Sequence, residues 1–164
     1  MNVNLQNVHQ KFNERQNRIR LYVINFIVSQ QRPYNLDEDM PTAIGDLGLT
    51  EEEYKADLEV LLSKDGFVID EERNVNFAYP VSAMPTNHHV KLQDGREFTA
   101  MCAIDAIGSA FTFHEDVTVD SVCQVTGDPI HIEIKDGKPV NFYPAGLMAL
   151  TVPLADMDNW AGSC

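Results

Sequence analysis

The sequence predicts an α+β protein, because its two halves carry different hydrophobic periods. Apolar residues recur at helical spacing within residues 7–31 and 54–62, whereas residues 81–164 hold short alternating segments separated by hairpin turns. Pro80 and Pro85 bound a linker between the halves. We therefore expect two domains, a helical module at 1–80 and a mostly antiparallel sheet core with a helical insert at 81–164.

The first helix is expected over residues 7–31, where Ile19, Val23 and Ile27 fall at helical spacing. Pro33 ends this helix, because the residue before a proline is pushed away from helical geometry. A glycine-punctuated segment at 41–48 makes a short helix at most.

A third helix and a hairpin complete the first half. Thr50 and Glu53 form a capping box, which predicts that a helix begins there and ends before Gly66. The two strands of the hairpin are expected at 67–70 and 75–79. Three helices followed by a hairpin is the element order of a winged helix, so this half is predicted to be a winged-helix-like module.

Winged helices often bind DNA, but the charge of this one argues against that use. The third helix carries five carboxylates, at positions 51, 52, 53, 57 and 59, against Lys55 and Lys64. The whole chain has a formal charge of -13, which repels phosphates instead of neutralising them. We therefore expect a packing or interaction module and no nucleic-acid partner.

The second half is expected to form two hairpins and further strands around one helical segment. Asp94-Gly95 and Asp136-Gly137 are strong hairpin turn signals. The expected strands are 89–92, 96–99, 111–113, 117–119, 131–134, 140–142 and 147–152.

The nearly uncharged run at residues 98–108 carries the most reactive side chains. If the run is helical, Cys102 and Asp105 share one face, because residues three apart are neighbours on a helix. Apolar surroundings would raise the pKa of Asp105, so that it could keep a proton. A nucleophile beside a proton donor can perform chemistry, but a cysteine in an apolar run can also be only a small buried side chain. Both interpretations stay open on spacing alone.

The three cysteines, Cys102, Cys123 and Cys164, are an odd and widely spaced set that does not suggest a disulfide framework. Thiolates select soft metals, and mercury should prefer them by the same reasoning. His88 and His89 are a weak metal signal and are expected to open a strand. The N-terminus lacks the pattern of a signal peptide, and no run reaches the roughly eighteen apolar residues of a membrane span. We therefore expect a cytoplasmic protein with reduced thiols and no membrane partner.

Four segments, in the same order, give the chain its resemblance to the organomercurial (alkylmercury) lyase family. They are residues 102–105 (CAID), 123–130 (CQVTGDPI), 143–146 (YPAG) and 162–164 (GSC). The intervals from Cys102 to Asp105, Cys123 and Cys164 are 3, 21 and 62 residues, close to the family pattern. The resemblance covers most of the chain.

The resemblance implies an enzyme of mercury detoxification that cleaves the carbon–mercury bond by protonolysis. At the matching positions, Cys102 and Cys164 would capture mercury, and Asp105 would relay a proton to the departing carbon and help to hold the Hg(II) product. Cys123 would be mainly structural. The implied partners are organomercurial small molecules as substrates. Low-molecular-weight thiols and a mercury reductase are the further implied partners, and they would take Hg(II) away. No resident cofactor is expected.

Two features depart from the family pattern. Members of the family continue well past the third cysteine, so we expect the sequence to be truncated at its C-terminus. Residues 107–110 (IGSA) are smaller than the bulky apolar segment of the family, so the substrate pocket is expected to differ.

Two non-enzymatic functions stay open beside the lyase. One is a non-catalytic, thiol-based metal-binding or metal-delivery relative, which would have no need of a proton donor at Asp105. The other is a thiol-based metal sensor that reads DNA with the winged helix, against which the acidic third helix argues. Release of benzene from phenylmercury would select the enzyme.

Overall fold

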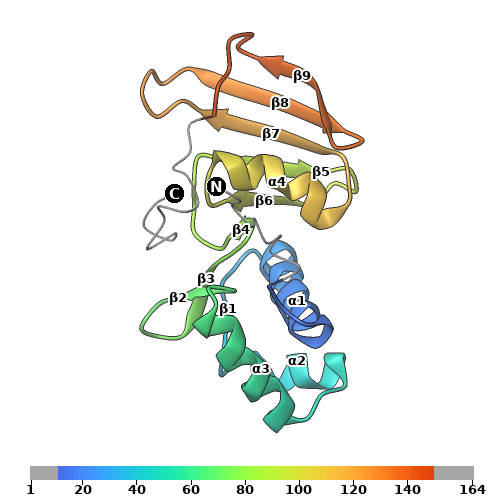
Figure 1. Cartoon of the computed structure of the whole chain (residues 1–164). Helices are drawn as coiled ribbons and strands as arrows, with labels where there is room; N and C mark the ends of the chain where they lie inside the picture. Colours follow the sequence, from blue (N-terminus) through green and yellow to red (C-terminus); the bar gives the residue numbers. More distant parts are fainter. Residues whose placement is uncertain (1–10, 150–164) are drawn as a thin grey trace, which may run out of the picture. The chain divides into compact units, whose positions relative to one another are not determined.

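The computed structural model describes residues 11–149 of the chain. By its contacts the chain divides into two compact units, Met1–Ala78 and Tyr79–Cys164. The described residues hold four helices together with antiparallel strands (Figure 1), so the α+β prediction is confirmed. None of these helices combines the length and the apolar character that a membrane crossing requires.

Within residues 11–78, the first unit contains three helices and three short strands. In chain order they are α1 (Glu14–Gln30), β1 (Tyr34–Asn35), α2 (Met40–Leu47), α3 (Glu51–Ser63), β2 (Val68–Ile69) and β3 (Asn74–Ala78). Both β1 and β2 pair antiparallel with β3. The order of helices and hairpin matches the expectation, with β1 as an addition, while the winged-helix class stays a prediction.

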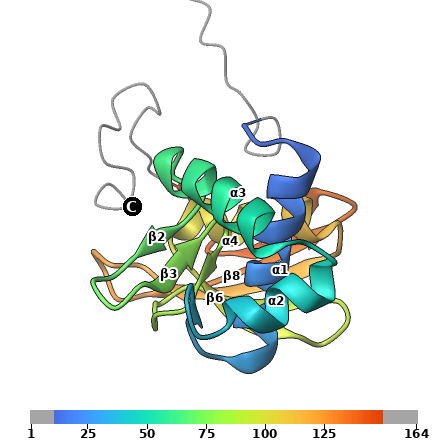
Figure 2. The same ribbon diagram turned by 90° about the horizontal axis from the view of Figure 1, so that it is seen from below.

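Local capping sets where two of these helices begin. Asn13 and Gln16 form a capping box, so α1 begins at Glu14 and not at residue 7. Thr50 and Glu53 form the capping box that the sequence predicts for α3. Figure 2 brings the three helices of this unit toward the viewer.

The first unit is held by an apolar core and a buried polar link between α1 and α3. Ile19, Val23 and Ile27 of α1 are at most 3% exposed. On α3, Asp57 is buried and accepts hydrogen bonds from Arg15 and Gln16 of α1. A buried carboxylate needs such partners, because burial without them would be costly.

Among residues 79–149, the second unit holds six antiparallel strands and one helix. Its elements are β4 (Val81–Ser82), β5 (His89–Leu92), β6 (Glu97–Ala100), α4 (Ala103–Phe113), β7 (Val117–Val122), β8 (Pro129–Lys135) and β9 (Lys138–Tyr143). The strands lie in the order β4-β6-β5-β7-β8-β9. The β8–β9 turn has positive φ at both Asp136 (50°) and Gly137 (69°), as a tight hairpin turn of this type requires.

Helix α4 is the crossover connection of this sheet. It joins β6 to β7, and β5 lies between them and is antiparallel to both. Strands β6 and β7 therefore run in the same direction, which a tight turn cannot connect. The helix contacts β5, β6 and β7, and Figure 1 shows it in front of β5 and β6. This arrangement places the junction of β6 and α4, at residues 101–102, beside the sheet.

Three local expectations for this half are wrong. Residues 111–113 are not a strand but the last turn of α4, where the ring of Phe113 packs 5.3 Å from that of Phe98. Tertiary packing overrides the strand propensity of this segment. Residues 80–85 are not only a linker, because β4 within them pairs with β6. Residues 147–149 form no strand, and the rest of the strand expected there lies outside the described residues.

Candidate functional site

The first turn of α4 brings Cys102 and Asp105 together. Cys102 is the N-cap of the helix, with extended backbone (φ -145°, ψ 177°), and its carbonyl accepts the first helical hydrogen bond from the Ala106 N–H at 2.9 Å. Asp105 is the third residue of the helix, and its carboxylate accepts hydrogen bonds from the backbone N–H and the thiol of Cys102. The backbone bond is half of a capping box, so the motif also starts the helix.

Asp105 is a buried carboxyl with an incomplete set of partners. It is 5% exposed, and its Oδ2 atom has no hydrogen-bond partner among residues 11–149. Burial raises the pKa of Asp105 to about 6, against the opposing effect of the two hydrogen bonds from Cys102. Near neutral pH this carboxyl can therefore take up a proton and release it again.

Cys102 and Asp105 together can bind a soft metal and transfer the proton that the thiol releases. A thiol that binds a soft metal loses its proton, because the thiolate is the ligand. The Asp105 carboxylate already accepts a hydrogen bond from the Cys102 thiol, so it is placed to receive that proton. The N-terminus of a helix also stabilises negative charge in its first turn, where both groups lie.

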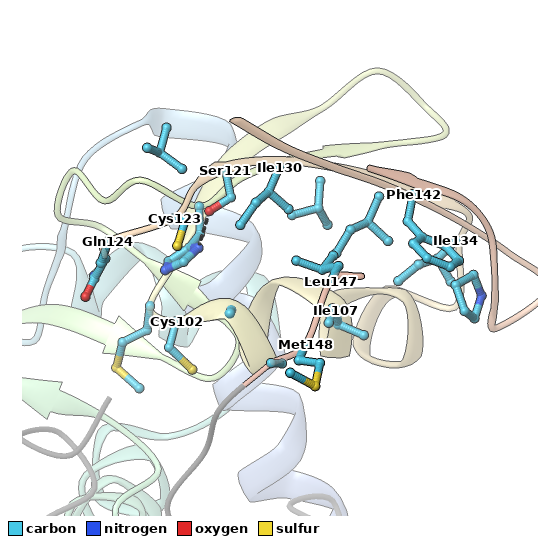
Figure 3. Close-up of a pocket in the computed structure, with 18 of the residues that line it drawn as sticks. Cys102, Ile107, Ser121, Cys123, Gln124, Ile130, Ile134, Phe142, Leu147 and Met148 are labelled. Atoms are coloured by element: carbon cyan, nitrogen blue, oxygen red, sulfur yellow. Dashed lines mark hydrogen bonds between the residues drawn. The ribbon is translucent and has the colours of Figure 1, made fainter. Parts of the chain in front are cut away.

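Cys102 opens onto a cavity of about 640 Å³ in the second unit. Polar and thiol groups gather around one part of its wall, where Figure 3 labels Cys102, Ser121, Cys123 and Gln124. His88 also lines the cavity and is the hydrogen-bond partner of Ser121. The Nδ1 atom of His88 lies 2.8 Å from the Ser121 hydroxyl. Burial lowers the pKa of His88, which favours a neutral ring at pH 7.

Cys123 lies at the start of the turn that follows β7. Its N–H donates to the Asp128 carbonyl, and its own carbonyl accepts from the Gly127 N–H, both at 2.9 Å. Hydrogen bonds to the sulfur, first from the Thr126 hydroxyl and then from the N–H groups of Thr126 and Val125, lower the pKa of this thiol. These bonds tie the turn together, and the sulfur also lines the cavity.

The other part of the cavity wall is apolar. Val119, Ile132 and Phe142 face one another in register across β7, β8 and β9, and all three line the cavity. Ile107 and Phe111 of α4 line the opposite side. An organic group bound here would therefore meet almost only hydrocarbon.

The predicted site residues are placed only in part. Cys102 and Asp105 are in contact, whereas Cys164 lies outside the described residues. Within residues 11–149, no three His, Cys, Asp or Glu side chains gather as a metal site. The sequence carries no local signal for Ser121, and for His88 only the weak metal signal of two adjacent histidines. Their proximity to Cys102 depends on the pairing of β5 with β7, which the sequence does not disclose.

Comparisons with known proteins identify one family to which the chain is similar. The family model described as MerB, alkylmercury lyase, matches residues 81–164. Alkylmercury lyases of Bacillus cereus and Clostridium butyricum are each 30% identical over 122 residues, which is 74% of this chain and 52% of theirs. The chain thus spans about half the length of these curated relatives.

A solved structure shows the same fold. The mercury-bound form of MerB2 matches with a TM-score of 0.63 at 21% identity, over 82% of this chain and 63% of that one. The match of the family model to residues 81–164, together with the two relatives, establishes the family. The chain belongs to the alkylmercury lyase family.

Proposed function

We propose that this protein cleaves the carbon–mercury bond of organomercurials by protonolysis, releasing a hydrocarbon and leaving thiolate-bound Hg(II). The observation that carries the proposal is the hydrogen bond from the Cys102 thiol to the buried Asp105 carboxylate, beside an apolar cavity. A protein that only binds mercury needs the thiol but has no use for a proton carrier next to it.

Capture is the first step of the proposed reaction. The sulfur of Cys102 forms a bond to mercury, and its proton passes to the Asp105 carboxylate, which becomes neutral. The group that accompanied the organomercury cation leaves as an anion. A second thiolate, assigned to Cys164, then adds to mercury and raises the electron density on the carbon bound to it.

Protonolysis is the second step. Asp105 gives its proton to the carbon atom, the electron pair of the carbon–mercury bond forms the new carbon–hydrogen bond, and the hydrocarbon departs. Mercury stays as Hg(II) on the two thiolates, and Asp105, again a carboxylate, helps to hold it. Low-molecular-weight thiols and a mercury reductase in the cytoplasm would then remove the metal. The residues supply this chemistry without a resident cofactor.

The decisive experiment is incubation with phenylmercury in the presence of excess thiol. We expect catalytic release of benzene, detected by gas chromatography, and none from the Cys102→Ser variant. Retention of intact phenylmercury on the protein, without benzene, would replace the lyase by a metal-binding relative. Because the chain spans about half of its curated relatives, the assay should be repeated with a longer version of the protein that matches their length.

A further inference from the structure

The cavity beside Cys102 is divided into a chemical end and a hydrocarbon end. In Figure 3, Cys102, Ser121, Cys123 and Gln124 lie at one side of the cavity, whereas Ile134 and Phe142 lie at the other. A substrate that carries mercury on one end and an apolar group on the other has the same polarity. Mercury bonded to Cys102 would leave its organic group facing the apolar part.

Helix α4 gives this cavity its length. Ala103, Ile107 and Phe111 are spaced by four residues, so they form one stripe along the helix, and all three line the cavity. From Cys102 to Phe111 the helix advances nine residues, which corresponds to about 13 Å at 1.5 Å per residue. The stripe is therefore much longer than a methyl or an ethyl group.

The far end of the stripe is bounded by Phe111 and the β8–β9 turn. A Cβ atom built on Gly137 would lie 3.2 Å from Cε1 of Phe111, so the ring rests on the backbone of that turn. Only glycine combines this close approach with a φ of +69°. Opposite the stripe, Val119, Ile132 and Phe142 supply the second apolar wall.

We propose that this cavity binds the organic group of the substrate along the stripe Ala103–Ile107–Phe111, and that the protein thereby selects long alkyl and aryl mercurials over methylmercury. This inference rests on the proposed function, from which it takes organomercurials as the substrate class. It adds that the protein recognises the organic group of the substrate. Each methylene group buried against these walls contributes about 0.8 kcal/mol, which corresponds to about fourfold in kcat/KM. Methylmercury reaches none of the stripe beyond its first residues.

The test is a series of straight-chain alkylmercury compounds from methyl to hexyl. For each compound we would measure alkane release by gas chromatography and alkylmercury capture by mass spectrometry of the protein. We expect kcat/KM, and the affinity of capture, to rise about fourfold per methylene until the chain reaches Phe111. A straight-chain series keeps the carbon attached to mercury primary from ethyl onward, so reactivity changes little.

Two isoleucines on α4 provide a matched pair of variants. Ile107 lines the cavity, whereas Ile104 is 40% exposed and is absent from its wall. Ile107→Trp fills the stripe and should reduce the preference for hexyl over ethyl by at least tenfold, while Ile104→Trp should leave it unchanged. If Ile107→Trp does not fold, Phe111→Ala serves as the second variant. It opens the far end of the cavity, so kcat/KM should continue to rise for alkyl chains longer than those that reach Phe111 in the parent.

The outcomes separate this inference from the proposed function. The inference is supported if kcat/KM or the affinity of capture rises with chain length, and if Ile107→Trp removes this rise while Ile104→Trp keeps it. The rise can be seen in cleavage or in capture alone. Capture with this dependence but without alkane release would overturn the lyase and keep the cavity assignment. Alkane release at rates independent of chain length, or equal effects of both tryptophan variants, would overturn the cavity assignment and keep the lyase.

Discussion

Asp105 holds its negative charge at a cost to the fold. Its pKa is 3.8 as an ordinary aspartate and about 6 in the folded chain, a rise of about 2 that corresponds to about 3 kcal/mol. Because the folded pKa lies above the unfolded one, the native state binds more protons between pH 4 and 6. Stability therefore falls as pH rises through this window, and the full cost is present above pH 6.

We predict that Asp105→Asn makes the protein more stable at pH 7.5 and much less active. The amide oxygen can still accept the Cys102 N–H bond, but the side chain no longer ionises, so unfolding should cost about 1 to 3 kcal/mol more than in the parent. At pH 4 the two proteins should unfold alike. Urea unfolding at both pH values measures the difference.

The same variant should capture mercury compounds and cleave them at least about 100-fold more slowly, because it lacks the transferable proton. Single-turnover kinetics would place this loss in the chemical step and not in capture. Cleavage at the parental rate would remove Asp105 from the role of proton carrier.

The pH dependence of kcat/KM should follow the ionisation of the same carboxyl. The proposed reaction begins from a Cys102 thiol bonded to an ionised Asp105, a form that is lost once Asp105 is protonated. We therefore predict that kcat/KM for phenylmercury falls below a pH of about 6, the pKa of Asp105. The residual activity of Asp105→Asn should show no such decline, and a persisting decline would assign it to another group.

Serine in place of each cysteine should give three different results, because serine keeps the shape of the side chain and loses the soft ligand. Cys102→Ser should abolish cleavage. Cys164→Ser should reduce it severely in a version that matches the length of the curated relatives. Cys123→Ser should mainly lower the free energy of unfolding, by roughly 1 kcal/mol, with activity per folded molecule retained. Loss of turnover in fully folded Cys123→Ser, with Cys102→Ser active, would contradict these roles.

At the scale of elements, the position of α4 on its sheet decides where Cys102 and Asp105 lie. The helix approaches closely because its buried face consists of small residues, among them Ala106, Ser109 and Ala110. Gly108 continues this pattern, since a Cβ atom there would lie 2.3 Å from the hydroxyl of Tyr79. The small segment at 107–110 is thus explained in part by packing against Tyr79.

We predict that Gly108→Ala destabilises the protein by about 1 to 2 kcal/mol, because overpacking outweighs the higher helix propensity of alanine. Combined with Tyr79→Phe, which removes the clashing hydroxyl, the substitution should cost less than it does alone. Thermal or urea unfolding of both single variants and the double variant gives the coupling energy. Additive effects would show that α4 shifts away from Tyr79 without strain.

Across the whole molecule, charge limits the possible partners. The formal charge is -13, and the first turn of α3 presents Glu51, Glu52 and Glu53. Of these, Glu51 pairs with Lys55 and Glu53 with Arg15. These pairs neutralise part of the charge, but the first turn of α3 itself carries no basic residue and so offers phosphates no cation of its own.

We predict that the chain does not bind duplex DNA at physiological ionic strength, because few cations are available to replace the counterions of the phosphates. Fluorescence anisotropy with a labelled duplex, with and without mercury compounds, measures this. Binding that weakens steeply with salt would contradict the prediction, and binding only after metal addition would favour a sensor.

The sequence predicts the elements with strong local signals and misses those that depend on pairing. The capping box at Thr50 and the turns at Gly95 and Gly137 are encoded within a few residues, so their elements were expected. Strands β1 and β4 are two residues long and exist only because β3 and β6 pair with them. Their existence cannot be predicted from local propensity.

The candidate site also has one part that local sequence predicts and another that depends on strand pairing. Cys102 and Asp105 are three residues apart, so one helical turn suffices to join them. His88, Ser121 and the apolar wall reach Cys102 only through the sheet, in which β5 pairs with β7 and β7 with β8. A single sequence contains the residues of such a cavity but not the register that assembles them.

Strand β9 is the last strand of its sheet among the described residues, and this position has a consequence for handling the protein. All six of its residues are exposed, and the exposed fractions of Val140 and Tyr143 are 55% and 60%. No other strand of residues 11–149 pairs with its outer edge. An edge with apolar side chains can template pairing with another chain, which Lys138 and Pro139 at its start only partly oppose. In concentrated solution, aggregation of this protein should therefore begin at β9.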